Sequence, residues 1–203
     1  MMLSQIRPAI VLLALFTLLT GLAYPLAITG VAQIAISGPA NGSLVSVKGV
    51  TVGSSLIGQN FASDKYFHGR PSATQAQDPA HPDDPSKTID APYNAANSTG
   101  SNLGPTSQKL LDRVKADAEA KRAAGLTGLI PADAVTTSAS GLDPHISPAY
   151  ALAQVAAVAK ARGLPEDRVR ALVEANVDGR GFGVVGEPRV NVLLLNMALD
   201  MLQ

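Results

Sequence analysis

The sequence predicts an α+β protein: one N-terminal transmembrane helix, then an extracytoplasmic domain of short strands and about four helices. The first observation is an apolar stretch from Pro8 to Ile36, 29 residues without a charged side chain. The second is the order of the patterns that follow, because short β-type runs come first and helical periods begin near Thr106. Strands followed by helices are typical of the α+β class.

Composition excludes several classes of function. The chain has 203 residues, and 16 basic side chains balance 16 acidic ones. A net charge of zero argues against nucleic-acid binding through a basic face. The sequence contains no cysteine, which excludes disulfides, thiolate zinc sites and cysteine nucleophiles.

The apolar stretch is long enough to cross a bilayer, since about 20 residues span the hydrocarbon. Between Ile10 and Val31 it holds twelve Leu, Ile, Val or Phe residues, which together favour insertion by about 4–7 kcal/mol. A cleaved signal peptide has an apolar region of roughly 7–15 residues and a small-residue cleavage site. This stretch is longer and has no clean site, so we interpret residues 9–36 as an uncleaved anchor, with a kink expected at Pro25.

The charges that flank the anchor predict its orientation. Arg7 and the terminal amine precede it, and the next charged residue is Lys48. The positive-inside rule then places residues 1–8 in the cytoplasm and residues 37–203 on the periplasmic side. We therefore expect a single-pass protein of the cell inner membrane that contacts membrane lipid and binds no nucleic acid.

The predicted periplasmic domain begins with two or three short strands. The runs Leu44–Val47 and Val50–Val52 have β-type composition, and glycines punctuate them. Residues 69–106 are different, because 24 of these 38 residues are Gly, Pro, Ser, Thr, Asn or Asp. We predict an irregular loop there, and long loops of this kind are often functional.

Helices are predicted from Thr106 onward. Thr106 or Ser107 can cap the first, which stops at Gly125. Ser147 and Pro148 form a strong start signal for a helix that ends at Gly163.

Two more helices are predicted near the end of the chain. Another start follows at Pro165, with acidic residues in its first turn. The last segment, Val190 to Leu202, is apolar nearly all round and is therefore expected in the core.

Motifs that carry chemistry are scarce. No phosphate-binding glycine loop of known pattern occurs, and we interpret the glycines of residues 179–183 as a turn. The three histidines lack the paired spacing of a metal site. Asp143 and His145 are the one pair with catalytic potential, since a carboxylate can orient an imidazole base. The favoured alternative is that both satisfy backbone groups ahead of the Ser147 cap, because no nucleophile elbow is present.

Four segments in this order resemble the C subunit of the Kdp potassium-transporting P-type ATPase, and together they extend over nearly the whole chain. They are Leu22–Leu26 in the anchor, Tyr66–Ser72 with Tyr93-Asn94 and Gly100–Thr106, Ser138–Pro148, and Gly186–Asn196. One departure is His68, which stands where the family pattern usually has tryptophan. We expect a packed ring at this position and no separate role.

The resemblance implies a non-catalytic accessory subunit of a high-affinity potassium uptake complex. Its partners would be a channel-like potassium-binding subunit, a P-type ATPase subunit and a small single-span subunit. ATP and K⁺ would serve the complex, and we assign no cofactor or metal to this chain. The family is also described as a catalytic chaperone that raises the ATP affinity of the ATPase subunit. The predicted topology conflicts with direct ATP contact, so we favour a stabilising or ion-gating role at the outer mouth of the channel-like subunit.

The resemblance also directs attention to particular residues. The partner-facing or structural candidates are Gly69, Arg70, Pro71, Asn102, Gly104, Asp143 and His145. Residues 69–106 are the expected partner-facing surface, and their acids Asp78, Asp83, Asp84 and Asp90 outnumber Arg70 and Lys87. This excess would concentrate K⁺ weakly, because screening limits its range to about 8–10 Å.

The alternative function is a membrane-anchored periplasmic hydrolase that uses Asp143 and His145.

Overall fold

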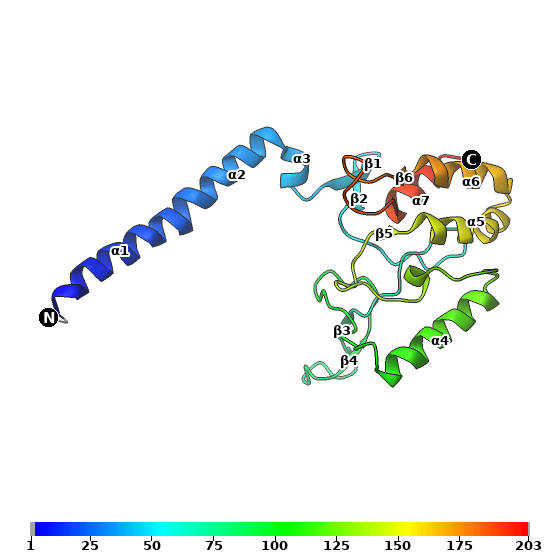
Figure 1. Cartoon of the computed structure of the whole chain (residues 1–203), viewed down its shortest axis with the longest axis horizontal. Coiled ribbons are helices and arrows are strands. Elements are labelled where there is room, and N and C mark those ends of the chain that lie inside the picture. The colour runs from blue at the N-terminus through cyan, green and yellow to red at the C-terminus, as the bar shows by residue number, and fades with distance from the viewer. Residues whose placement is uncertain (1–2, 203) are drawn as a thin grey trace. The chain divides into compact units, whose positions relative to one another are not determined.

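The computed structural model describes residues 3–202. The chain forms two compact units, one that ends at Ser54 and one that begins at Ser55, and each is described by itself. Figure 1 follows the chain through both units. The first two residues of the predicted cytoplasmic segment, and Gln203, lie outside the described residues.

The first unit contains a long apolar helix. After a 3-10 turn at Leu3–Gln5, α1 (Ile6–Leu18) and α2 (Tyr24–Ala35) join through a π-helical turn at Leu19–Ala23. Together they make 30 residues from Ile6 to Ala35, and the most apolar part has no buried residue. At about 1.5 Å per residue the helix is roughly 45 Å long, more than the roughly 30 Å of a bilayer core.

A kink was expected at Pro25, and a π-helical turn at Leu19–Ala23 lies just before that residue. Pro25 has no N–H to donate, and its ring crowds the carbonyl group one turn earlier. A single wide turn at Leu19–Ala23 absorbs this mismatch without ending the helix.

A short helix and a β-hairpin complete the first unit. The helix α3 (Ser37–Ala40) leads into β1 (Leu44–Val47), which pairs antiparallel with β2 (Val50–Ser54). Lys48 and Gly49 both have positive φ, 51° and 81°, as a tight hairpin turn requires. The two runs predicted as strands therefore form this hairpin.

The second unit combines four longer helices with small sheets, which confirms the predicted α+β class. The helices are α4 (Gln108–Ala123), α5 (Pro148–Arg162), α6 (Glu166–Ala175) and α7 (Val192–Asp200). A three-stranded antiparallel sheet has the order β5 (His145–Ile146), β7 (Arg189–Asn191), β6 (Val177–Asp178). Two further pieces are the 3-10 turn η3 (Ala132–Ala134) and a hairpin of β3 (Gln75–Gln77) and β4 (Thr88–Asp90).

The core lies among α5, α6 and α7 and is mainly aliphatic. Its fully buried side chains include Val155, Val158, Val169, Val173, Leu195 and Leu199, with Tyr150 and Phe67 beside them. This agrees with a composition in which aromatic residues are only 4%.

The predicted ends of α5 are confirmed, whereas the predictions for α4 and α7 are only partly correct. The Ser147 hydroxyl accepts a hydrogen bond from the Tyr150 N–H at 3.0 Å, and Gly163 ends the helix at φ 66°. Ser107 occupies the N-cap position of α4, but its side chain makes no capping hydrogen bond. The segment predicted as one buried helix from Val190 begins as strand β7, and Asn191 then caps α7.

Candidate functional site

Arg70 and Asp143, both predicted as candidates, form an ion pair. The Arg70 Nη1 lies 3.1 Å from the Asp143 Oδ2, and both side chains are about three-quarters buried. The guanidinium also donates to the carbonyl groups of Thr136 and Thr137 at 3.3–3.5 Å. Arg70 therefore joins three separated parts of the second unit.

Asp143 acts on the backbone rather than as part of a catalytic pair. Its Oδ1 accepts a hydrogen bond from the His145 N–H at 3.0 Å, whereas the His145 Nδ1 lies 3.6 Å away, too long for a hydrogen bond. Burial acts to raise the pKa of Asp143, but the nearby His145 ring, the hydrogen bond from the His145 N–H and the Arg70 guanidinium together outweigh it and keep the pKa below its usual value. These contacts match the structural interpretation of the pair.

Gly69 is required because Tyr93 packs directly against it. A Cβ atom at Gly69 would collide with the Tyr93 hydroxyl group, and a Cβ atom at Gly58 would collide with the Tyr93 ring. That hydroxyl donates to the Arg70 carbonyl group at 2.8 Å. Burial raises the pKa of Tyr93 to about 12, so the phenol stays protonated and keeps donating at neutral pH.

Residues 69–106 are held by hydrogen bonds instead of apolar burial. The Ser72 hydroxyl donates to the Gly141 carbonyl at 2.8 Å, and the Thr74 hydroxyl donates to the Ala91 carbonyl at 2.6 Å. Thr74 is only 1% exposed. The segment predicted as an irregular loop therefore has fixed polar contacts and includes the hairpin β3–β4.

Two of the four segments that resemble the Kdp C subunit, the one that ends in Gly100–Thr106 and Ser138–Pro148, approach each other closely around Gly141. Its φ is +68°, and a Cβ atom there would lie 2.7 Å from the Thr99 carbonyl oxygen. At Gly100 an added Cβ atom would lie 2.7 Å from the Ala139 carbonyl oxygen. Only glycine permits this close approach of two backbones.

The remaining candidates lie at the edge of this region. Pro71 is half-buried, whereas Asn102 and Gly104 are exposed. Asn102 has a positive φ of 50°, and the Gly104 carbonyl accepts from the Ser107 N–H at 3.0 Å where α4 begins. These residues shape the turn into α4 and are not part of the Arg70 ion pair.

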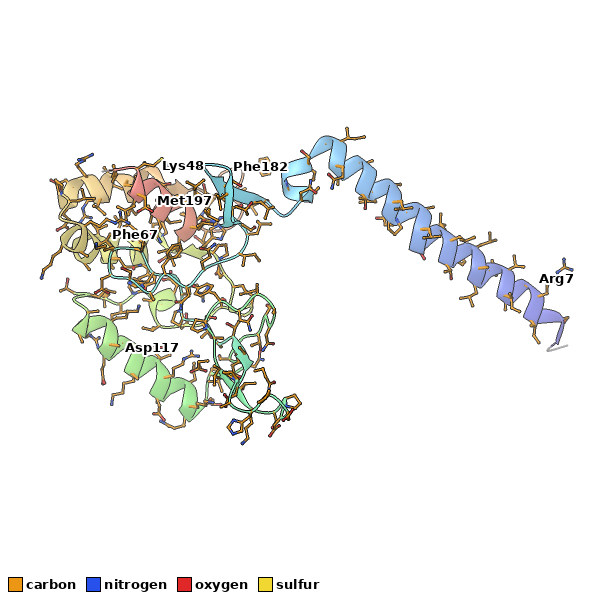
Figure 2. All side chains as sticks on the ribbon, turned by 180° about the vertical axis from the view of Figure 1, so that it is seen from behind. Arg7, Lys48, Phe67, Asp117, Phe182 and Met197 are labelled. Atoms are coloured by element: carbon orange, nitrogen blue, oxygen red, sulfur yellow. The ribbon has the colours of Figure 1, made fainter. Side chains whose placement is uncertain are left out.

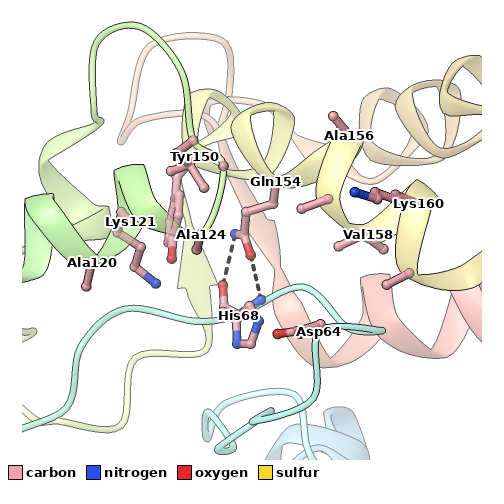
Figure 3. A pocket seen from close by; sticks show the side chains of 14 residues that line it. Asp64, His68, Ala120, Lys121, Ala124, Tyr150, Gln154, Ala156, Val158 and Lys160 are labelled. Atoms are coloured by element: carbon pink, nitrogen blue, oxygen red, sulfur yellow. Dashed lines mark hydrogen bonds between the residues drawn. The ribbon is translucent and has the colours of Figure 1, made fainter.

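Sequence reasoning missed two buried amides that clasp the chain at Phe67 and His68. Asn196 accepts from the Phe67 N–H at 2.8 Å and donates to its carbonyl at 2.9 Å. Gln154 does the same at His68, at 2.8 and 3.1 Å (Figure 3). Asn196 is 1% exposed and Gln154 is 3% exposed. A signal existed, because a lone amide on an apolar helix face must find a partner when buried.

A cleft of about 820 Å³ lies beside this clasp, with five alanines in its walls. Lys121 projects into it, and its Nζ lies 5.5 Å from the centroid of the Tyr150 ring (Figure 3). Burial lowers the pKa of Lys121 and of His68, and the Lys121 charge lowers that of His68 further. Within residues 3–202 no group of three or more His, Asp or Glu side chains is placed to hold a metal.

The predicted acidic residues lie on the connection between β3 and β4 and on β4 itself. Asp78 bonds the His81 ring at 2.8 Å, and Asp84 accepts from the Ser86 hydroxyl at 2.6 Å. These hydrogen bonds lower the pKa of both carboxyl groups. Asp78 and Asp84 therefore stabilise turns, while Asp83 and Asp90 are exposed.

Comparison with known proteins gives a consistent match along the chain. The family model for "K+-transporting ATPase, c chain" matches residues 6–201. A potassium-transporting ATPase KdpC subunit from Methylobacterium nodulans is 62% identical over 201 residues, covering 99% of this chain and 98% of the relative. KdpC subunits from Bradyrhizobium diazoefficiens and Rhodopseudomonas palustris (strain BisB5) are 60% and 59% identical, and each alignment covers 98% of both chains.

Proposed function

Since the chain belongs to the KdpC family of K⁺-transporting ATPase subunits, we propose that it is a membrane-anchored subunit that stabilises the complex from the outer side. It is an accessory subunit and is not catalytic on its own. The hydrolase alternative is not supported, because Asp143 is committed to Arg70 and to the backbone of His145.

The observation that carries the proposal is the contrast between the two units. The helix Ile6–Ala35 buries none of its most apolar part, whereas the second unit has its own aliphatic core. A long uncovered apolar helix belongs in lipid. Arg7 at its start orients the N-terminus toward the cytoplasm and the second unit toward the periplasm of the inner membrane.

The contact surface for other subunits is proposed on residues 69–106. The network around Ser72, Thr74 and Gly141 holds this segment in place without a large apolar core. It thus presents a preformed surface, which lowers the entropic cost of binding. On it Ile89 is a large apolar side chain that is 45% exposed on the hairpin strand β4.

The partners proposed for this surface are the channel-like potassium-binding subunit and the P-type ATPase subunit, with the small single-span subunit beside the anchor. A periplasmic unit does not meet cytoplasmic ATP. The family description of a raised ATP affinity is therefore proposed as an effect transmitted through subunit contacts, with no nucleotide bound by this chain.

Purification of the complex through this chain tests the contact surface. Ile89→Asp is expected to reduce recovery of the other subunits, because it places a charge in an apolar contact. The matched control is Leu129→Asp, which changes a side chain that is 97% exposed outside the segment. Full recovery of every subunit with Ile89→Asp would reject residues 69–106 as the main contact.

A further inference from the structure

The cleft beside the clasp at Phe67 and His68 contains a buried hydroxyl group without a partner. Tyr150 is 0% exposed, and within residues 3–202 its hydroxyl makes no hydrogen bond. Figure 3 shows the Tyr150 ring extending from α5 into the space between Lys121 and His68. Buried polar atoms in native proteins nearly always have a partner. A hydroxyl left unpaired in the wall of a cleft therefore points to a group that enters from outside.

Lys121 is a second donor in the same wall whose charge is not balanced. Its Nζ lies 5.5 Å from the centroid of the Tyr150 ring, and in the part of the chain that the structure describes it forms no ion pair. Asp117, on the same helix α4 (Figure 2), lies 3.9 Å from Arg113 instead. Burial lowers the pKa of Lys121, and the charge of Asp117 only partly opposes this effect. An anion placed in the cleft would supply the missing counter-charge.

The rest of the lining decides what kind of anion fits. Five alanines make much of the cleft wall small and aliphatic. Lys160 and Asp64 also line the cleft, but both are exposed and their charges are opposite, so Lys121 supplies the net positive charge. Burial and the Lys121 charge keep the pKa of His68 below 6.5, so this ring is neutral at neutral pH. The cleft thus suits a single negative charge on an aliphatic body, whereas a phosphate dianion would be left partly uncompensated.

We propose that this cleft binds a small aliphatic monocarboxylate. One carboxylate oxygen would accept a hydrogen bond from the Tyr150 hydroxyl, and the other would pair with the Lys121 ammonium, whose flexible stem lets it move from the ring to the ligand. The aliphatic chain of the ligand would lie against the alanines. The cleft volume of about 820 Å³ is in the range of small-molecule sites, roughly 300–1,000 Å³. This site is separate from the Arg70–Asp143 ion pair and does not depend on the proposed anchoring.

Isothermal titration calorimetry tests the site with sodium butyrate as the probe. The full chain is kept in an uncharged detergent at pH 7.5, and sodium chloride holds the ionic strength constant. We expect saturable binding of butyrate at one site per chain. Butyramide, which has the same size and no charge, and inorganic phosphate are expected to bind at least about tenfold more weakly, because neither combines one negative charge with an aliphatic body.

Two variants locate the binding. Lys121→Met and Tyr150→Phe are each expected to weaken butyrate binding about tenfold or more, because each removes one charge-assisted hydrogen bond. The matched control is Lys115→Met, which removes an exposed lysine of α4 and should bind butyrate as wild type does. Without ligand, Tyr150→Phe should unfold at the same temperature as wild type or higher, since the hydroxyl it removes has no partner.

Four results would overturn the proposal. The first is the absence of saturable butyrate binding to the wild-type chain. The second is binding of phosphate or butyramide as strong as that of butyrate, which would indicate a general anion effect or apolar partitioning. The third is butyrate binding that Lys121→Met and Tyr150→Phe leave unchanged, which would place the ligand elsewhere. The fourth is a clear loss of stability in ligand-free Tyr150→Phe, which would mean that the hydroxyl is already paired within the protein.

Discussion

Replacing Asn196 with leucine is expected to destabilise the second unit, because it removes the clasp on Phe67 at nearly constant volume. The Asn196 side chain is 1% exposed and makes two hydrogen bonds to the Phe67 backbone, at 2.8 and 2.9 Å. Each backbone group left unpaired costs about 1–3 kcal/mol. Burying leucine instead of an amide returns about 1 kcal/mol.

The expected net loss is about 1–5 kcal/mol in the free energy of unfolding. The measurement is thermal unfolding of the full chain in mild detergent, followed by circular dichroism, with a drop in Tm of about 2–20 °C. Asn176→Leu is the control, because Asn176 is half-buried and its amide makes one hydrogen bond, to Leu172. If Asn196→Leu lowers stability no more than this control, the clasp does not hold Phe67 in the core.

Three further predictions concern the polar segments. Gly141→Ala is expected to cost about 1–3 kcal/mol in denaturant unfolding, because its φ is +68° and a Cβ atom would meet the Thr99 carbonyl, whereas Gly104→Ala has open space and should be neutral. The pKa of Asp143 in the folded protein is below the usual 3.8. Its ionised carboxylate therefore stabilises the folded state fully at pH values above 3.8, and this contribution is lost as the pH falls through the folded pKa. Wild type should then lose more stability between pH 6 and pH 3 than Asp143→Asn does, and equal losses would contradict the ion pair. Asp83→Asn with Asp90→Asn should weaken apparent K⁺ affinity of the complex by at most about two-fold in low salt and leave it unchanged at physiological salt; an unchanged affinity in low salt would remove the steering role.

The sequence predicted what short-range patterns determine. The Ser147 hydroxyl caps α5 and Gly163 ends it, because both effects depend on residues within one helical turn. The long apolar helix was equally predictable, because the 29 residues from Pro8 to Ile36 are uncharged and mainly apolar, and the structure has one helix over Ile6–Ala35. The glycines of residues 179–183 were correctly interpreted as a turn.

Hydrogen bonds between residues far apart in the sequence could not be predicted from local sequence patterns. Asn196 and Phe67 are 129 positions apart, and Gln154 and His68 are 86 apart. The sequence shows Asn196 and Gln154 as polar residues in apolar helices, but it does not show which backbone groups their amides bind. The irregular segment was recognised by its composition, yet its order depends on Ser72 reaching Gly141 across 69 positions.

The measurement that tests the central claim most directly is the sidedness of the two units. The chain has no cysteine, so single cysteines at Gln5 and Leu129 can be labelled with a membrane-impermeant maleimide in intact spheroplasts. A subunit that acts from the periplasm should label at Leu129→Cys in intact cells and at Gln5→Cys only after lysis. The reverse pattern would place the second unit in the cytoplasm and contradict the proposed role.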